Sequence, residues 1–288
     1  MLKKLTLKKR INSDDGLMGT THALSALAIS LLLAWLTSDF MFNKLIGSTD
    51  SVVFVTAIII IIGASLMPDL DAVKSTSINT LGVIGSLLSK IMRGFSSIVQ
   101  NLIKGPSDKS SDPHRGFWHT PLAAILVGLG ITGLTSIDKH LFTVADAHIT
   151  VATLIVFFII YISVQLMVAS LLSFINKKSK KNPLSQIITQ LGCLVFSLTL
   201  LYFLPPNLDY KWVGAVVSFG WIIHILGDMI TVSGVPLLFP LKYRGKRWWD
   251  FRLPLGVKAG GFFEKAILIP IFAIIVILSI IKIFPLII

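Results

Sequence analysis

The stretch VVFVTAIIIIIGASLM, residues 52–67, is followed directly by PDLD, residues 68–71. Its side chains are almost pure hydrocarbon, and no charged group occurs in it before Asp69. A helix needs about 20 mostly apolar residues to cross the hydrocarbon core of a bilayer. The stretch therefore predicts a short transmembrane helix over residues 51–67, with two aspartates at the membrane surface where that helix ends.

Six further apolar runs share this character. The seven predicted spans cover residues 21–41, 51–67, 118–136, 149–175, 184–205, 212–231 and 265–288. Apolar residues make up 54% of the 288-residue chain and charged residues only 14%, a balance that soluble domains seldom reach. The sequence predicts an all-α polytopic membrane protein with about seven transmembrane helices, forming a single membrane-embedded domain over residues 1–288.

The segment 77–105, SINTLGVIGSLLSKIMRGFSSIVQNLIKG, has a different pattern. Apolar residues recur every three to four positions, at Leu81, Ile84, Leu88, Ile91, Phe95, Ile98 and Leu102. The other side of the expected helix is polar, with Ser86, Lys90, Arg93, Ser97 and Asn101. Such an amphipathic helix lies in the membrane interface and does not cross the bilayer.

Basic residues set the predicted orientation. Of the 26 lysines and arginines, all but Lys44, Lys139, Lys211 and Lys282 fall on one side of the seven-span topology. Cytoplasmic loops carry such an excess, so we expect a cytoplasmic N-terminus in a cytoplasmic (inner) membrane. Residues 1–16 then form a cytoplasmic basic tail, and residues 72–117 form a cytoplasmic loop that contains the interfacial helix. Because the positive charges follow these loops throughout, the net charge of +12 does not indicate a nucleic-acid partner.

Titratable side chains gather at the cytoplasmic ends of the predicted spans. They are His22, Asp69, Asp71, His114, His119, His224, Asp228 and Glu264. His140 and His148 fall in a loop on the opposite side. Ionisable groups in or beside membrane segments cost free energy and usually serve a function. The convergence therefore predicts one functional site at one membrane face.

Two motifs in this set indicate metal binding. HILGD, residues 224–228, places His224 and Asp228 four positions apart and so on one face of a helix. In PDLD, Pro68 disfavours a helical conformation of Met67, so one expectation is a turn that ends the helix. The other, which favours a functional site, is an extended segment with Asp69 and Asp71 on the same side.

Four histidines and three aspartates exceed what one catalytic zinc ion takes from a protein. They suit two divalent ions that share a carboxylate. Mixed nitrogen and oxygen ligation favours zinc, with manganese or iron as alternatives. The expected metal ligands are His22, Asp69, Asp71, His114, His119, His224 and Asp228.

Four motifs in this order also resemble a known family. TH (21–22), PDLD (68–71), HRGFWH (114–119) and HILGDMITVSGVPLLFP (224–240) are similar to those of the YdjM-like family. These bacterial inner-membrane proteins are described as metal-dependent hydrolases by prediction, and some are under LexA control in the SOS response. The resemblance implies that the seven residues above form the family's metal site. It further implies that Glu264, in GGFFE, occupies an acidic position after a glycine-rich turn.

The leading functional hypothesis is a membrane-bound hydrolase that uses a metal-activated water. Asp71 or Glu264 is the expected general base, and Arg115 is expected to neutralise a substrate oxyanion. The segment YRGKRWWDFR, residues 243–252, adds guanidinium groups and expected interface anchors in Trp248 and Trp249. This basic and aromatic rim favours a phosphoester or a phospholipid-like substrate drawn from membrane lipid.

A transporter or a metal-handling membrane protein without hydrolytic activity is the alternative hypothesis. Transporters place ionisable groups near the bilayer midplane and often show internal repeats. Here the polar set lies at one face and no repeat is visible, which argues against that class. The motif HExxH of zinc-dependent proteases is absent from the sequence.

The predicted topology can be tested by cysteine labelling from one side of the membrane. In a Cys193→Ser background, new cysteines at Ser110 and Ser179 should react with the same impermeant reagent from the cytoplasmic side. Labelling of the two positions from opposite sides would contradict a site at a single face.

Overall fold

The computed structural model describes residues 18–36, 46, 48–72, 76–103, 116–144, 147–175, 183–205 and 208–287. Its α-helices are α1 (Gly19–Leu36), α3 (Ser51–Ala64), α4 (Thr76–Ile103), α5 (Pro121–Thr135), α6 (Val151–Ile175), α7 (Pro183–Phe203), α8 (Trp212–Met229) and α9 (Ile269–Ile287). Two 3₁₀ turns, η1 (Pro68–Asp71) and η3 (Phe117–His119), lie between helices, and the π-helix η4 (Glu264–Leu268) leads into α9.

The helices confirm the predicted class of fold. Six of them, α1, α3 with η1, α6, α7, α8 and α9 with η4, are long and apolar enough to cross a membrane, and α5 is a shorter apolar helix. They correspond one by one to the seven predicted spans. The chain is an all-α polytopic membrane protein.

Helix α3 forms the centre of the bundle. It packs against α1, α6 and α8, and 72% of its membrane-spanning window is buried. Only 11% of the corresponding windows of α7 and α9 is buried, so these helices turn leucine and isoleucine side chains outward. In a bilayer such exposure costs no hydrophobic free energy, because the lipid tails are as apolar as the side chains.

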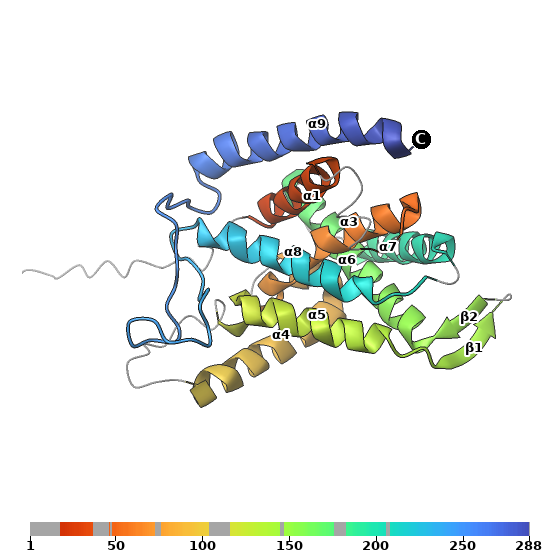
Figure 1. Ribbon diagram of the computed structural model, residues 1–288, viewed down its shortest axis with the longest axis horizontal. Coiled ribbons are helices and arrows are strands. Elements are labelled where there is room, and N and C mark those ends of the chain that lie inside the picture. Colours follow the sequence, from red (N-terminus) through yellow and green to blue (C-terminus); the bar gives the residue numbers. More distant parts are fainter. Residues whose placement is uncertain are drawn as a thin grey trace, which may run out of the picture.

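The two ends of the bundle differ in structure. At one end, strands β1 (His140–Val144) and β2 (Ala147–Thr150) form an antiparallel hairpin between α5 and α6. At the other end, an irregular segment, residues 230–263, connects α8 to the start of the last helix (Figure 1). The hairpin was not predicted from the sequence, and neither was the π-helix.

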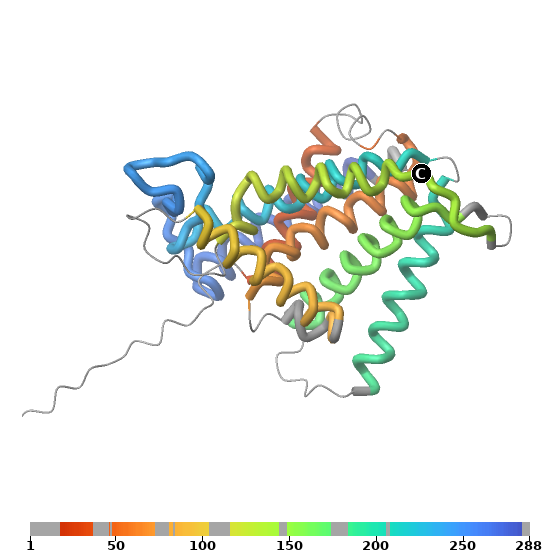
Figure 2. Tube along the Cα trace, turned by 90° about the horizontal axis from the view of Figure 1, so that it is seen from below, coloured from red at the N-terminus to blue at the C-terminus, as the bar shows by residue number. Residues whose placement is uncertain are grey.

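Helix α4 is amphipathic, as predicted, but it has three faces in place of two. Gly85, Ser89, Met92 and Ser96 are buried against the protein. An apolar stripe and a polar stripe both remain exposed. In Figure 2, α4 crosses α6 steeply and does not run alongside it.

Close contact between α5 and α8 depends on one glycine of α5. A Cβ atom at Gly128 would lie 1.9 Å from Ser218 Oγ and 2.7 Å from the carbonyl oxygen of Gly214. Gly130 and Gly133 belong to the same sequence pattern, but a Cβ atom at either would meet no described atom within 4 Å. Of these three glycines, Gly128 alone serves the close approach of α8, because the positions of Gly130 and Gly133 on α5 turn away from that helix.

This contrast yields a matched pair of variants. Gly128→Ala should destabilise the protein by about 1–3 kcal/mol through overpacking against α8. Gly130→Ala should be neutral or slightly stabilising, because alanine favours a helix interior over glycine by up to ~1 kcal/mol. Thermal unfolding in detergent, followed by circular dichroism, measures both. Equal shifts of the two midpoints would contradict the packing.

Candidate metal centre

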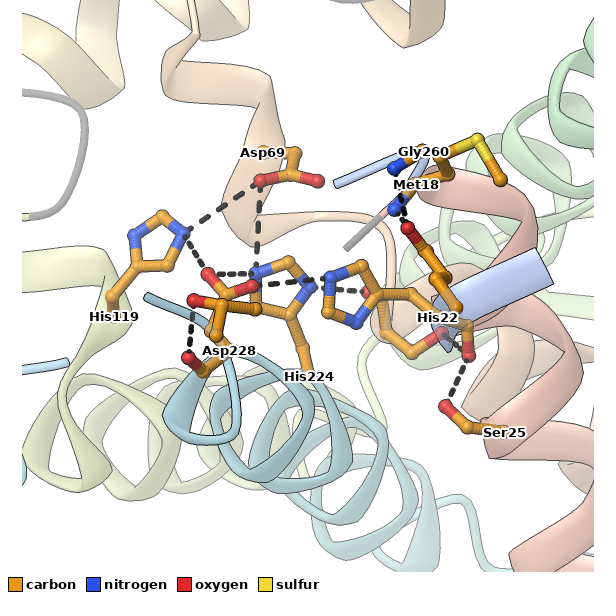
Figure 3. A network of polar contacts seen from close by, with 11 residues as sticks. Met18, His22, Ser25, Asp69, His119, His224, Asp228 and Gly260 are labelled. Carbon is orange, nitrogen blue, oxygen red and sulfur yellow. Dashed lines mark hydrogen bonds and ion pairs between the residues drawn. The ribbon is translucent and has the colours of Figure 1, made fainter. Parts of the chain in front are cut away.

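Five of the predicted site residues meet at one end of the bundle, although they come from four separate elements (Figure 3). They are His22 in the first turn of α1, Asp69 in η1, His119 in η3, and His224 and Asp228 at the end of α8. We refer to these five residues as the His/Asp cluster. Four of the five are at most 1% exposed, whereas the Asp69 side chain is 24% exposed. Asp69 therefore lies on the open side of the cluster.

The donor atoms are spaced like neighbouring ligands of an ion. The Nε2 atoms of His119 and His224 each lie 3.6 Å from Asp228 Oδ2. They lie 3.7 and 3.6 Å, respectively, from Asp69 Oδ1. Two bonds of about 2.0–2.2 Å at a tetrahedral angle separate their donor atoms by about 3.3–3.6 Å. The observed separations are too long for hydrogen bonds and fit a cation between the groups.

A hydrogen bond fixes which nitrogen of His224 faces the cluster. His224 Nδ1 lies 2.8 Å from the carbonyl oxygen of Ser65, so this nitrogen carries the proton and donates. Nε2 is then an acceptor, and it has no hydrogen-bond partner among the described residues. It faces carboxylate oxygens, which are also acceptors. A bound cation resolves this arrangement, and a backbone carbonyl on the second ring nitrogen is typical of metal-binding histidines.

Asp228 joins two overlapping donor groups. One group contains His22, His224 and Asp228, and the other contains Asp69, His119 and His224, with donor atoms in each within 4.8 Å of one another. Asp228 Oδ1 lies 3.3 Å from His22 Nε2, while Oδ2 faces the other two histidines. One carboxylate therefore reaches both ends of the cluster. The set of imidazoles and carboxylates fits zinc, manganese or iron.

Ser65, the C-cap of α3, holds the two stacked imidazoles in place. Its carbonyl accepts from His224, and its hydroxyl donates to Ile62 O at 2.7 Å and to His22 O at 3.3 Å. The rings of His22 and His224 stack with centroids 4.0 Å apart. Sequence analysis missed Ser65, because a serine near a helix end is common and carries no spacing signal.

A tryptophan pair positions His119. The indole N–H of Trp118 donates to Met92 O of α4, and the indole N–H of Trp221 in α8 donates to Trp118 O, each at 2.7 Å. Thr120 then caps α5 through a hydrogen bond from Ala123 N–H. The short turn η3 is thus tied to three helices, so His119 has little freedom to move.

Of the two expectations for PDLD, the structure has the turn that ends the helix and not the extended segment. Met67 is helical, with φ −67° and ψ −39°, and residues 68–71 form the 3₁₀ turn η1. The carbonyl of Met67 accepts a hydrogen bond from Leu70 N–H, which outweighs the local preference against a helical residue before proline. In a turn with three residues per revolution, positions i and i+2 do not share a side. Asp69 joins the His/Asp cluster, whereas Asp71 is buried and belongs to neither donor group.

Glu264 lies beside the cluster with both carboxylate oxygens engaged. Oε1 accepts from Met18 N–H at 2.7 Å, and Oε2 accepts from Gly260 N–H at 2.6 Å. Met18 begins the turn that leads to His22, whose backbone N–H donates to Met18 O. Glu264 therefore anchors the start of α1, and these contacts favour a positioning role over that of a general base.

The remaining predicted residues are His114, Arg115 and the basic and aromatic rim. His114 and Arg115 fall outside the described residues. Trp248 is not an interface anchor, because it is 7% exposed and stacks on Phe239. Arg247 donates to the carbonyl of Ile103 at the end of α4. The predicted rim thus serves partly to fasten α4 to the segment after α8.

Fold and cluster together define a polytopic α-helical membrane protein with a buried histidine–aspartate centre at one end of its helices. The chain belongs to the YdjM inner membrane protein family, whose family model matches residues 17–172 and 189–285. No curated protein and no solved structure gives a significant match.

Alanine substitution tests the cluster. Asp69→Ala, His119→Ala and Asp228→Ala should each remove most bound metal, because each deletes one of few donor groups. His140→Ala, in the exposed hairpin at the other end, should leave metal content unchanged. Elemental analysis of the purified variants provides the measurement. Equal loss in His140→Ala would show that misfolding, not ligation, explains the effect.

Proposed function

We propose that the protein is a metal-dependent hydrolase of the cytoplasmic membrane, with its site at the cytoplasmic face. The observation that carries the proposal is the meeting of three imidazoles and two carboxylates whose acceptor atoms face one another. The proposed ions are divalent, zinc above all with manganese or iron as alternatives. Two ions are proposed because Asp228 presents Oδ1 to His22 and Oδ2 to His119 and His224.

The five cluster residues would hold the metal. His22 and Asp228 Oδ1 serve one end of the cluster, and Asp69 and His119 serve the other. When bound, the metal supplies Lewis acidity and lowers the pKa of a water molecule. Rigid placement by Ser65 and the Trp118–Trp221 pair keeps the ligands in position, so they need not rearrange during turnover.

A carboxylate must accept the proton of the attacking water. Glu264 is poorly suited, because both of its carboxylate oxygens already accept hydrogen bonds from backbone N–H groups. Asp69 is better placed, since Oδ1 faces the histidines and its side chain is the most exposed of the cluster. Asp71, the neighbouring acid proposed from the sequence, remains the second candidate for this role.

The proposed substrate is a phosphoester or a phospholipid-like molecule. Arg115 immediately follows His114 in the sequence, and Arg244 and Arg252 are exposed on the segment after α8. Guanidinium groups bind phosphate oxygens in a bidentate manner. A transporter is less consistent with the cluster, because the ionisable groups lie at the helix ends and not midway along broken helices.

The proposal is tested by metal content and activity on the same preparation. Purified protein should contain metal by elemental analysis and should hydrolyse a phosphodiester or a phospholipid. Chelation should abolish turnover, and return of the metal should restore it. Asp228→Asn serves as the control, because it keeps the side-chain shape while removing the charge. Metal-replete protein without activity on any phosphoester would leave the transporter class as the better description.

A separate prediction concerns Arg115. Arg115→Lys keeps the positive charge but loses the bidentate fork, so activity on an anionic phosphoester should fall by roughly ten- to a thousandfold. Metal content should stay at the wild-type level, because arginine does not ligate cations. Full turnover of a metal-replete Arg115→Lys protein would show that the residue only contacts lipid headgroups, and would remove the main argument for a phosphate-bearing substrate.

A further inference from the structure

Helix α4 exposes an apolar stripe and a polar stripe side by side. One stripe of this helix is apolar and exposed, with Ile91, Ile98 and Leu102 exposed by 58, 59 and 80%. In a soluble protein an apolar stripe of this kind would face the core. The core-facing stripe is a different one, in which the small residues Gly85, Ser89 and Ser96 alternate with the apolar Leu81 and Met92.

The core-facing stripe contacts the two short turns that carry cluster residues. Helix α4 packs against η1, which contains Asp69, and against η3, which contains His119. Ser96 Oγ accepts from Phe117 N–H at 3.4 Å, and Met92 O accepts from the indole of Trp118 at 2.7 Å. Phe95 adds ring contacts to Phe117 and Trp118, with centroids 5.1 and 5.4 Å apart.

Lipid is the occupant that fits the exposed apolar stripe. Helix α4 packs on α6, whose last turns expose Leu171 and Leu172, so the stripe continues an apolar surface of a membrane-spanning helix. Lys90 is exposed on the adjoining polar stripe, where it can reach an anionic headgroup. An amphipathic helix lies in the interface with its apolar face buried in the acyl region.

We infer that the exposed apolar stripe of α4 is a lipid-binding surface, occupied by acyl chains of the leaflet nearest the His/Asp cluster. With its apolar stripe in this leaflet, α4 keeps its core-facing stripe in contact with η1 and η3. It thereby holds Asp69 and His119 in position beside His224 and Asp228 of α8. The inference concerns the segments that carry these residues, and it stands whether or not a metal binds there.

The first arm of the test locates the stripe. Spin labels are attached to single cysteines at Ile91, Ile98, Ser97 and Asn101 in a Cys193→Ser background. The protein is placed in nanodiscs of phosphatidylethanolamine and phosphatidylglycerol. Labels at the two isoleucine positions should relax with oxygen, which partitions into lipid, and those at the two polar positions with chromium oxalate, which stays in water.

Two results of this arm would overturn the inference. Access of chromium oxalate to all four labels would place α4 in water. Shielding of the Ile91 and Ile98 labels from both reagents, with spin–spin broadening, would show that a second copy of the chain covers the stripe.

The second arm measures whether contact between α4 and lipid stabilises the turns η1 and η3. The pair Ile91→Gln with Ile98→Gln makes the apolar stripe polar, and the pair Ser97→Gln with Asn101→Gln is the matched control on the polar stripe. Hydrogen exchange of segments 68–72 and 116–120 in nanodiscs should accelerate about tenfold in the first pair, because their hydrogen bonds open more often, and stay unchanged in the control. Unchanged exchange in both pairs would overturn the holding role. If the isoleucine pair does not fold, Ile98→Gln alone replaces it, with Asn101→Gln as its control.

Discussion

The close packing of three imidazoles and two carboxylates at the helix ends is the constraint on which the rest of the structure depends. Asp228 is 1% exposed, and its oxygens approach His22, His119 and His224 at 3.3–3.6 Å. Burying a carboxylate in a low-dielectric region is costly unless positive charge or hydrogen-bond donors lie beside it. The surrounding elements must therefore hold these five side chains close together.

Neighbouring helices hold the cluster residues close together by contacting the ends of the elements that carry them. Helix α3 stops at Ser65, whose carbonyl orients His224 and whose hydroxyl contacts the carbonyl of His22. Helix α1 is fixed by Glu264 at the beginning of the last membrane segment. Helix α4 holds η1 and η3 from outside. Each element that carries a residue of the His/Asp cluster is thus fixed by a neighbour that contributes no residue to it, and this keeps the geometry of the cluster.

Much of this could be predicted from the sequence, for identifiable physical reasons. Apolar run length predicts membrane helices because the bilayer sets their span, and alternation of the spans placed His22, Asp69, His119, His224 and Asp228 at one end. The i, i+4 spacing of His224 and Asp228 is a helical property that tertiary structure does not alter.

Other features depend on contacts that a sequence pattern does not contain. The turn at Pro68 became 3₁₀ because Leu70 N–H reached the carbonyl of Met67, and this separated Asp71 from Asp69. Trp118 and Trp248 resemble interface anchors in the sequence, yet both are held by aromatic partners inside the protein. Glycine spacing on α5 could not distinguish Gly128 from Gly130, since only the position of α8 decides which one needs to lack a Cβ.

X-ray absorption at the zinc edge, recorded on purified protein loaded with zinc, tests whether the His/Asp cluster binds a metal ion. A centre built from this cluster should show nitrogen and oxygen neighbours at about 2.0–2.1 Å together with the outer scattering of imidazole rings. Loss of part of the imidazole scattering in His224→Ala should accompany this spectrum. A sulfur neighbour at about 2.3 Å, or a spectrum without imidazole scattering, would contradict a metal centre built from the His/Asp cluster.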